Sequence, residues 1–349
     1  MKSKKLLLNT FDYELFLGQR SGSVDDCLLT PTNLVLDVLL KHNMKAIFFA
    51  DTTHLLKLKE YAARYDKCHR DFELVKTHLQ TLVREGHYVF PHIHPHWLDA
   101  VYLPEINEWD LSNVIKYRFN SIANEDREKL FNGSVNLLYE ILSYVNPDYK
   151  IDSYRSGGWC IQPFEDFKPF FQKNNIKYDF SVLGGFYLFS SVQFFDFSKA
   201  PEKSIYNFSN DVTIEDPNGE FTEFNLSSIK PSAFQRAMHR VWLKTLHRVF
   251  NDHSYNRGKG QIAQQLKNEG VKGGSKVQNI LTSNHERVSV ELLTKPKVNH
   301  YLSYLEKNDY MHFISHPKML IKHHLKSFDK FLTAARKLYD IETDFRKMV

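Results

Sequence analysis

The sequence predicts an α/β protein in which a parallel sheet is covered by helices. Three observations lead to this prediction. Short apolar runs alternate with helical patterns, boundary signals such as Thr30-Pro31 and Gly86 separate them, and polar clusters follow several of the runs. Repeated βα units of this kind form either a doubly wound sheet or a closed barrel. The chain of 349 residues is long enough for one large domain or two ordinary ones, and we expect a single domain over residues 1–349.

The individual elements follow from hydrophobic periodicity and from boundary residues. Thr30-Pro31 predicts a helix start with a hydroxyl N-cap ahead of a proline. Gly86 ends another helix, because glycine tolerates the left-handed conformation found there. Strands are predicted at 5–11, 45–50, 87–92, 151–155, 177–182, 221–226 and 310–315. Helices are predicted at 30–42, 71–85, 126–145, 164–174, 232–251, 300–307 and 325–340.

The region from about 200 to 285 departs from this alternation, and we expect it to be an insertion or subdomain on the βα framework. It contains a basic amphipathic helix in which Arg236, Arg240, Lys244 and Arg248 recur every four residues. Like charges at this spacing repel, so the stripe indicates either an anionic partner or a solvated face with intramolecular pairing. The anionic partners considered are an inner-leaflet membrane surface and the diphosphate of a lipid-linked or nucleotide-linked glycan.

Composition excludes several classes of protein. Hydrophobic residues make up 42% of the chain and aromatic residues 14%, which supports a sizeable core and excludes global disorder. A net charge of +5 is too mild to predict a nucleic-acid partner. Three scattered cysteines fit a reducing compartment rather than a disulfide framework. The N-terminal segment has only three consecutive apolar residues where a secretory signal needs roughly 7–15, and no apolar run approaches the ~20 residues of a membrane span, so we expect a cytoplasmic protein.

Three histidines occupy alternating positions at the end of the predicted strand at 87–92 and just after it, namely His92, His94 and His96. Imidazole is the commonest protein ligand for zinc and related ions. Alternate residues of an extended segment point to the same side, so the three rings could converge on one ion. We therefore predict a metal site here, with a solvated histidine-rich turn as the alternative.

Other predicted strands also end in polar residues. Asp12 and Glu14 follow the first strand, Arg155 ends the strand at 151–155, and His316 follows the last one. Because the carboxyl ends of parallel strands meet at one edge of a sheet or barrel, we expect these side chains to lie near the histidines. Together they supply the ligands, base and acid of a hydrolytic metal centre.

These residues resemble a known family in order and spacing. Thr10-Phe11-Asp12, His92 with His96, Arg155, and Phe313-Ile-Ser-His316 are similar to motifs of the polysaccharide deacetylases of the NodB-like type, carbohydrate esterase family 4. The resemblance extends over about residues 5–185 and again over 300–320. It implies a distorted (β/α)7-type barrel that removes N-acetyl or O-acetyl groups from a sugar, and we expect that role in surface polysaccharide biosynthesis.

The resemblance also implies roles for individual residues. Asp12 would be the general base, Arg155 its partner and His316 the acid, with Asp179 assisting. One divalent ion, expected to be zinc with cobalt, nickel, manganese or iron as alternatives, would be held by one acidic residue and two histidines. By family spacing the histidines would be His92 and His96.

The chain departs from the family pattern at two places. Tyr13 replaces the usual second aspartate, so the acidic ligand would be Glu14, which shares a strand face with Asp12. His94 has no family counterpart. It would replace His96 as a ligand, bind substrate, or donate to a nearby carboxylate.

The substrate-binding residues are predicted from their positions beside these motifs. Trp97 and Trp159 are candidate walls for stacking a sugar ring, with ordinary packing as the alternative. A backbone N–H near Gly157 or Gly158 is a candidate donor to the oxyanion of the reaction.

Two other functions remain open from the sequence. The pair His92-x-His94 is also found in amidohydrolase-like or phosphoesterase-like metal hydrolases. A deacetylase-like barrel without the second aspartate could instead be a non-catalytic protein that binds glycan or anionic lipid. Metal content and acetate release distinguish these alternatives.

Overall fold

The computed structural model describes residues 2–249 and 285–348, and its centre is a nine-stranded sheet. The strand order is β10-β11-β7-β6-β3-β2-β1-β14, and β15 pairs with β1. The seven strands from β11 to β14 in this order are parallel, while β10 is antiparallel to β11. Their bounds are β1 Lys4–Tyr13, β2 Ile47–Asp51, β3 Tyr88–Ile93, β6 Ser153–Ser156, β7 Tyr178–Asp179, β10 Ile205–Phe208, β11 Phe221–Phe224, β14 Tyr310–Ser315 and β15 Asp340–Glu342.

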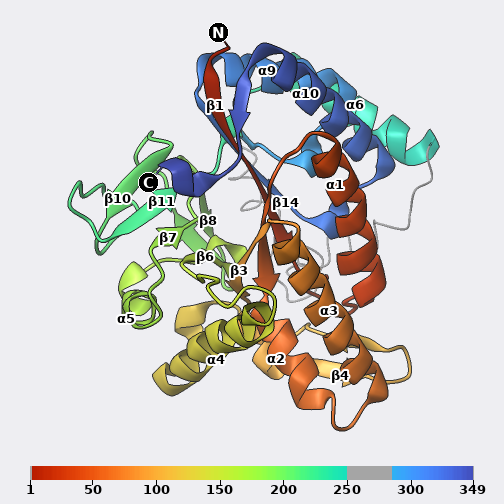
Figure 1. Ribbon diagram of the computed structural model, residues 1–349, viewed down its shortest axis with the longest axis vertical. Helices are drawn as coiled ribbons and strands as arrows, with labels where there is room; N and C mark the ends of the chain where they lie inside the picture. The colour runs from red at the N-terminus through yellow and green to blue at the C-terminus, as the bar shows by residue number, and fades with distance from the viewer. Residues whose placement is uncertain (1, 250–284, 349) are drawn as a thin grey trace.

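The sheet curls into an incomplete barrel with helices on its outside (Figure 1). At the seam between β11 and β14, the Ser227 N–H donates to the His312 carbonyl at 3.3 Å. The His312 N–H in turn donates to the Ser227 hydroxyl at 2.9 Å. The predicted fold class, a distorted (β/α)7-type barrel, is confirmed, and the doubly wound alternative is not what the chain adopts.

The helices form the outer layer, with α1 against α10 and with α2, α3 and α4 against one another. Their bounds are α1 Thr30–Lys41, α2 Thr52–Tyr61, α3 Asp66–Arg84, α4 Asn124–Ser143, α5 Lys168–Lys173, α6 Ala233–Val249, α9 Val298–Lys307 and α10 Lys322–Leu338. Two small hairpins are formed by β4 Val101–Leu103 with β5 Glu108–Asp110 and by β8 Tyr187–Phe189 with β9 Phe194–Asp196. A further antiparallel pair joins β12 Ser228–Ile229 to β13 Glu286–Arg287.

Boundary residues explain some of these elements and correct others. Gly86 has φ of 80° just after α3, as predicted, and its N–H donates to the Val83 carbonyl at 2.9 Å. Thr30 does not cap α1, because a helical turn at Asp25–Leu29 runs directly into that helix. Helix α2 was not predicted. It starts right after β2, where the Asp51 side chain accepts the N–H of His54 at 3.2 Å.

Aromatic side chains fill the barrel beneath the carboxyl ends of the strands. Phe345, near the C-terminus, is fully buried and lies 5.4 Å from the rings of both Phe180 and Phe224. Phe49 lies 5.3 Å from Phe180, and the Arg155 guanidinium lies 4.2 Å above the Phe49 ring. This apolar floor excludes water from below, so the polar side chains above it face one another in a weakly screened environment.

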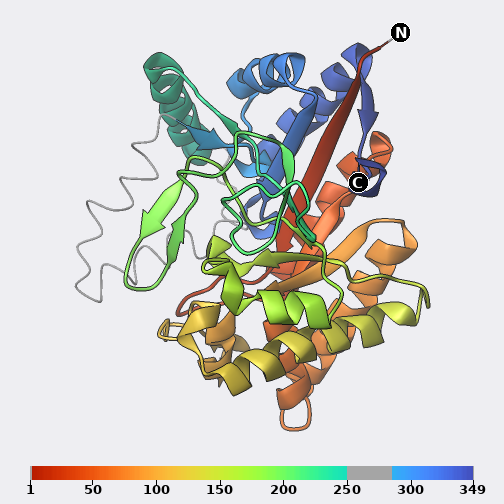
Figure 2. The same cartoon turned by 90° about the vertical axis from the view of Figure 1, so that its left-hand side faces the viewer.

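The expected insertion at about 200–285 is described only in part. Its first portion supplies β10 and β11 to the main sheet, so that portion continues the barrel. Figure 2 shows α6, in teal, at the outer side of the molecule. Residues 250–284 and the side chains of Arg240, Lys244 and Arg248 lie outside the described residues, and the domain boundaries stay a prediction. Among the helices that are described, none combines the length and the apolar character needed to span a bilayer.

Candidate metal centre

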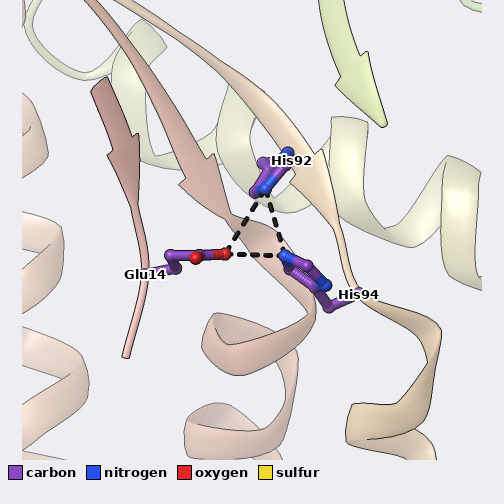
Figure 3. A group of neighbouring side chains, drawn as sticks. All are labelled: Glu14, His92 and His94. Atoms are coloured by element: carbon purple, nitrogen blue, oxygen red, sulfur yellow. Dashed lines mark hydrogen bonds and ion pairs between the residues drawn. The ribbon is translucent and has the colours of Figure 1, made fainter. Parts of the chain in front are cut away.

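Three side chains converge at the carboxyl end of the barrel, Glu14 directly after β1, His92 near the end of β3 and His94 directly after it (Figure 3). Glu14 Oε2 lies 2.6 Å from His94 Nε2 and 3.4 Å from His92 Nε2, and the two Nε2 atoms are 3.1 Å apart. All three residues are at most 5% exposed. Tetrahedral ligands of a zinc ion at ~2.0–2.1 Å lie roughly 3.3 Å from one another. The 3.4 and 3.1 Å separations are close to this value, and the 2.6 Å separation is that of a hydrogen bond between Glu14 and His94.

Strand register explains why these side chains meet. Asp51 of β2 pairs with His92 of β3, and His92 pairs with Arg155 of β6, so residues far apart in sequence share one level of the sheet. Strand β1 extends to Tyr13, and side chains alternate between the two faces of a strand, so Asp12 and Glu14 both point to the interior. The Tyr13 side chain points to the outside, where its hydroxyl contacts His78 at 2.9 Å.

The His92 ring is oriented for ligation. Its Nδ1 lies 2.8 Å from the Arg155 carbonyl, which can only accept a hydrogen bond. A neutral His92 therefore carries its proton on Nδ1 and keeps the lone pair of Nε2 toward Glu14 and His94. The backbone N–H of His94 donates to the Thr53 hydroxyl at 3.0 Å, and a side chain at Gly157 would collide with the His94 ring, which a Cβ atom would approach to 2.7 Å. A glycine is thus needed at position 157 so that the backbone can pass close to the His94 ring.

The structure does not place His96 with the other two histidines. Strand β3 ends at Ile93, and Pro95–Asp99 forms a turn of 3-10 helix, so the alternation of side chains stops at His94. The His96 ring stacks on Tyr117 at 5.1 Å, and neither of its ring nitrogens has a partner among the described residues. The preference for His96 over His94 therefore needs correction: the group that can hold an ion is Glu14, His92 and His94.

Asp12 lies beside this group and is paired with a buried cation. Arg155 is fully buried and donates from Nη1 to Asp12 Oδ1 at 2.6 Å, from Nη2 to the Thr10 hydroxyl at 2.7 Å and from Nε to the Phe180 carbonyl at 2.9 Å. Burial alone raises the pKa of Asp12, but the charges of Arg155, His92 and His316 outweigh it and the pKa is lowered. Asp12 is therefore a carboxylate at neutral pH.

His316 completes the cluster from the end of β14. Its Nε2 lies 3.5 Å from Asp12 Oδ2 and 3.7 Å from Glu14 Oε1, and its side chain is 23% exposed, more than any other member. Its Nδ1 and its backbone N–H contact the Glu291 carboxylate at 3.2 and 2.9 Å. Burial lowers the pKa of His316, but Glu291 and the two neighbouring carboxylates raise it above its ordinary value.

Two residues of this cluster were not predicted from the sequence. Glu291 precedes β14 in a short 3-10 turn and carries no spacing signal, although Arg287 four residues earlier pairs with it at 2.6 Å. Lys318, two residues after His316, donates to Glu14 Oε1 at 2.9 Å. Its position beside the His316 motif is a signal in the sequence, but lysines are usually exposed, so the sequence does not predict that this one is buried in the cluster.

The predicted assistant Asp179 makes different contacts. Its carboxylate accepts the hydroxyl of Ser181 at 2.8 Å and the N–H of Ser181 at 3.3 Å, and it faces Glu223 across the β7–β11 pair. Both carboxyl groups are fully buried. Glu291, rather than Asp179, is the carboxylate on His316, because β7 lies on the far side of Arg155 from β14 in the sheet order.

The predicted sugar-stacking residues differ from each other. Trp97 is 0% exposed and donates its indole N–H to Asp51 at 2.6 Å, so it is a core residue and the prediction of a substrate wall is wrong. Trp159 is partly exposed with φ of 60°, and its stacking role stays a prediction. Gly158 has φ of 59°, and a Cβ there would meet the Tyr117 hydroxyl at 2.6 Å, so glycine is required, while its role as an oxyanion donor remains untested.

No family model and no curated protein matches the sequence. Solved structures do show similarity. A candidate polysaccharide deacetylase from Mycobacterium smegmatis aligns at 12% identity with a TM-score of 0.46, over 100% of this chain and 89% of that one. The catalytic domain of a peptidoglycan N-acetylglucosamine deacetylase from Eubacterium rectale aligns at 12% identity with a TM-score of 0.34, over 98% and 89%.

The chain is also similar to a solved structure of an enzyme from a different class. A 4-alpha-glucanotransferase from Thermococcus litoralis aligns at 9% identity with a TM-score of 0.49, over 99% of this chain and 40% of that one. The similar structures thus include glycan deacetylases and a glucan-transferring enzyme. The residues of the candidate metal centre, rather than these matches, carry the functional conclusion.

Proposed function

We propose that this protein is a metal-dependent hydrolase that removes an acetyl group from an N-acetylated or O-acetylated sugar. The observation that carries the proposal is the convergence of Glu14, His92 and His94 beside an ionised Asp12 and a carboxylate-paired His316. Two imidazoles and one carboxylate are a usual ligand set for catalytic zinc, which leaves positions open for water and substrate. Zinc is therefore the ion we assign to the site.

The chemistry of the chain's own residues fits this reaction. A divalent ion would supply Lewis-acid polarisation of the acetyl carbonyl. Asp12, held by Arg155, takes a proton from the attacking water, because a carboxylate that is ionised at neutral pH can serve as a general base. His316, on the more exposed side of the cluster, donates a proton to the leaving amine or hydroxyl of the sugar. Glu291 orients His316 and favours its protonated form.

The experiment combines metal analysis with acetate release. Purified protein is expected to contain about one zinc per chain and to release deuteroacetate from a deuteroacetylated sugar in a panel of N-acetylated oligosaccharides, nucleotide-linked N-acetylhexosamines and O-acetylated sugars. Asp12→Asn should lower release by about 10²–10⁴-fold with metal content unchanged, because it removes the base without removing a ligand.

The matched control is Asp309→Asn. Asp309 pairs with Lys5 and lies directly before β14, at the end of this strand opposite to His316. It should leave both metal content and acetate release as in the wild type. Acetate release that survives in Asp12→Asn would contradict its role as base. A protein that holds no metal and releases no acetate would favour the non-catalytic glycan-binding or lipid-binding alternative.

We also propose that the enzyme works in the cytoplasm in surface polysaccharide biosynthesis and contacts an anionic membrane through α6. The exposed fractions of Phe234, Met238, Val241 and Trp242 are 71, 43, 66 and 37%, which leaves an apolar strip on the outside of this helix. The helix carries no acidic residue. Its sequence places basic residues at every fourth position beside this apolar strip, namely Arg236, Arg240, Lys244 and Arg248. This pattern supports binding at a lipid–water interface.

Co-sedimentation with vesicles that contain anionic phospholipid tests this partner. Reversal of the four basic residues to glutamate should abolish salt-sensitive binding. Reversal of Lys322, Lys326, Lys330 and Lys337 on α10 is the matched control and should leave binding unchanged. Equal, salt-insensitive binding by all three proteins would exclude the membrane as the partner of α6.

A further inference from the structure

Lys318 is a buried cation that contacts the three consecutive residues directly after β1. It lies in the short turn Pro317–Met319 directly after β14 and is 6% exposed. Its ammonium donates to Glu14 Oε1 at 2.9 Å and to the Leu15 carbonyl at 2.6 Å, and it lies 5.3 Å from the centre of the Phe16 ring. A buried ammonium with two fixed acceptors has little freedom to move, so it defines where Glu14 Oε1 lies.

We propose that Lys318 is a positioning residue that commits one oxygen of Glu14 and leaves the other as a single-oxygen metal ligand. This inference rests on the proposed metal site. Glu14 Oε1 is bound by Lys318, whereas Oε2 alone faces the Nε2 atoms of His92 and His94. A glutamate has one more rotatable bond than an aspartate, so without such a contact it can turn its carboxylate or offer both oxygens to an ion.

The charges in the cluster support this division. Asp12 and Glu14 each have their own buried cation, Arg155 at 2.6 Å and Lys318 at 2.9 Å. Arg155 binds Asp12, the residue proposed as the base, and Lys318 binds Glu14, the residue proposed as the ligand. The two carboxylates therefore keep separate partners and do not share one proton or one ion, which neighbouring carboxylates otherwise do.

A second buried lysine provides the comparison. Lys5 is 5% exposed and pairs with Asp309 at 2.7 Å, but it lies at the start of β1, away from the metal centre. Loss of Lys5 or of Lys318 removes a buried cation with one carboxylate partner. Only Lys318 touches a residue of the metal group, so the two variants separate a general effect of a lost buried charge from an effect on ligation.

The test is titration of the metal-free protein with Co²⁺ while its visible absorption is recorded. Lys318→Met and Lys318→Gln should change the dissociation constant for Co²⁺ by at least about tenfold. They should also weaken the visible bands, because a second oxygen of Glu14 raises the coordination number. The spectrum of Lys318→Arg, which keeps the charge, should be closer to that of the wild type. The spectrum and the Co²⁺ affinity of Lys5→Met should equal those of the wild type.

The outcomes distinguish this inference from the function itself. Cobalt uptake by the wild type with an unchanged spectrum and affinity in both Lys318→Met and Lys318→Gln would overturn the role of Lys318 and leave the proposed function standing. A wild-type protein that takes up no cobalt would overturn both. Lys318→Gln retains a donor for the Leu15 carbonyl, so it carries the test if thermal melting shows that Lys318→Met does not fold.

Discussion

Two buried pairs of carboxylates lie in the same sheet, and their surroundings give them opposite properties. Asp12 on β1 and Glu14 directly after it are 4 and 5% exposed, and Asp179 on β7 and Glu223 on β11 are 0% exposed. Burial raises the pKa of all four. At β1, Arg155, Lys318 and the histidines outweigh burial and lower the pKa of both groups.

At β7 and β11, no cation among the described residues offsets burial to the same extent. The pKa of Glu223 is raised well above its usual range by burial and by the charge of Asp179, while burial also raises the pKa of Asp179. The pKa of Glu223 is therefore shifted upward where those of Asp12 and Glu14 are shifted downward. The comparison shows that the partner, rather than burial, decides whether a carboxylate in this barrel can take a proton or hold an ion.

Metal affinity gives the largest expected contrast between the two pairs. Glu14→Gln should weaken zinc binding by at least about a hundredfold, since it removes the only charged ligand of the group. Glu223→Gln is the matched change in the other pair and should leave zinc affinity within about threefold of the wild type. Competition with a chromogenic chelator measures both, and equal losses would show that the two pairs do not differ as described.

The two candidate histidines provide the next test. His94→Ala should lower zinc affinity by about a hundredfold, whereas His96→Ala should change it by less than about threefold, because only His94 lies with Glu14 and His92. Equilibrium dialysis with metal analysis gives both values, and His92→Ala is the positive control. A larger loss for His96→Ala would restore the ligand pair that family spacing suggested.

Another buried carboxylate, Glu291, should affect turnover without affecting metal content. Glu291→Gln keeps an acceptor for His316 but removes the charge that favours the protonated imidazole. We expect kcat for acetate release to fall about tenfold while zinc content stays at the wild-type level. An unchanged kcat would mean that His316 needs no orienting carboxylate.

The smallest expected effect is on stability. The folded-state pKa of Glu223 is raised, so its contribution to stability is fully present below its unfolded pKa near 4.5 and is lost as the pH rises through the folded pKa. Glu223→Gln removes this loss. The difference in melting temperature between Glu223→Gln and the wild type should therefore grow in favour of the variant by a few degrees as the pH is raised from 5 to 8. A difference in melting temperature that does not change with pH would contradict the raised pKa of Glu223.

Much of the fold was predictable because it depends on local patterns. Apolar runs and boundary residues located most strands and helices, including α3 with Gly86 at its end. Helix α2 was missed because it follows β2 without a connecting loop. Strand β7 is shorter than the predicted 177–182, since only Tyr178–Asp179 pairs with its neighbours.

The sequence by itself determined which residues could carry the chemistry. Asp12 and Glu14 share one face of β1, and His92 and His94 follow at the end of β3, because side-chain alternation along a strand is a local property. Only the tertiary structure decided how these groups are partnered. His316 meets Glu291 across 25 positions, and Glu14 meets Lys318 across 304. Such pairs depend on strand order and register, which burial of the whole core sets, so spacing along the chain does not reveal them.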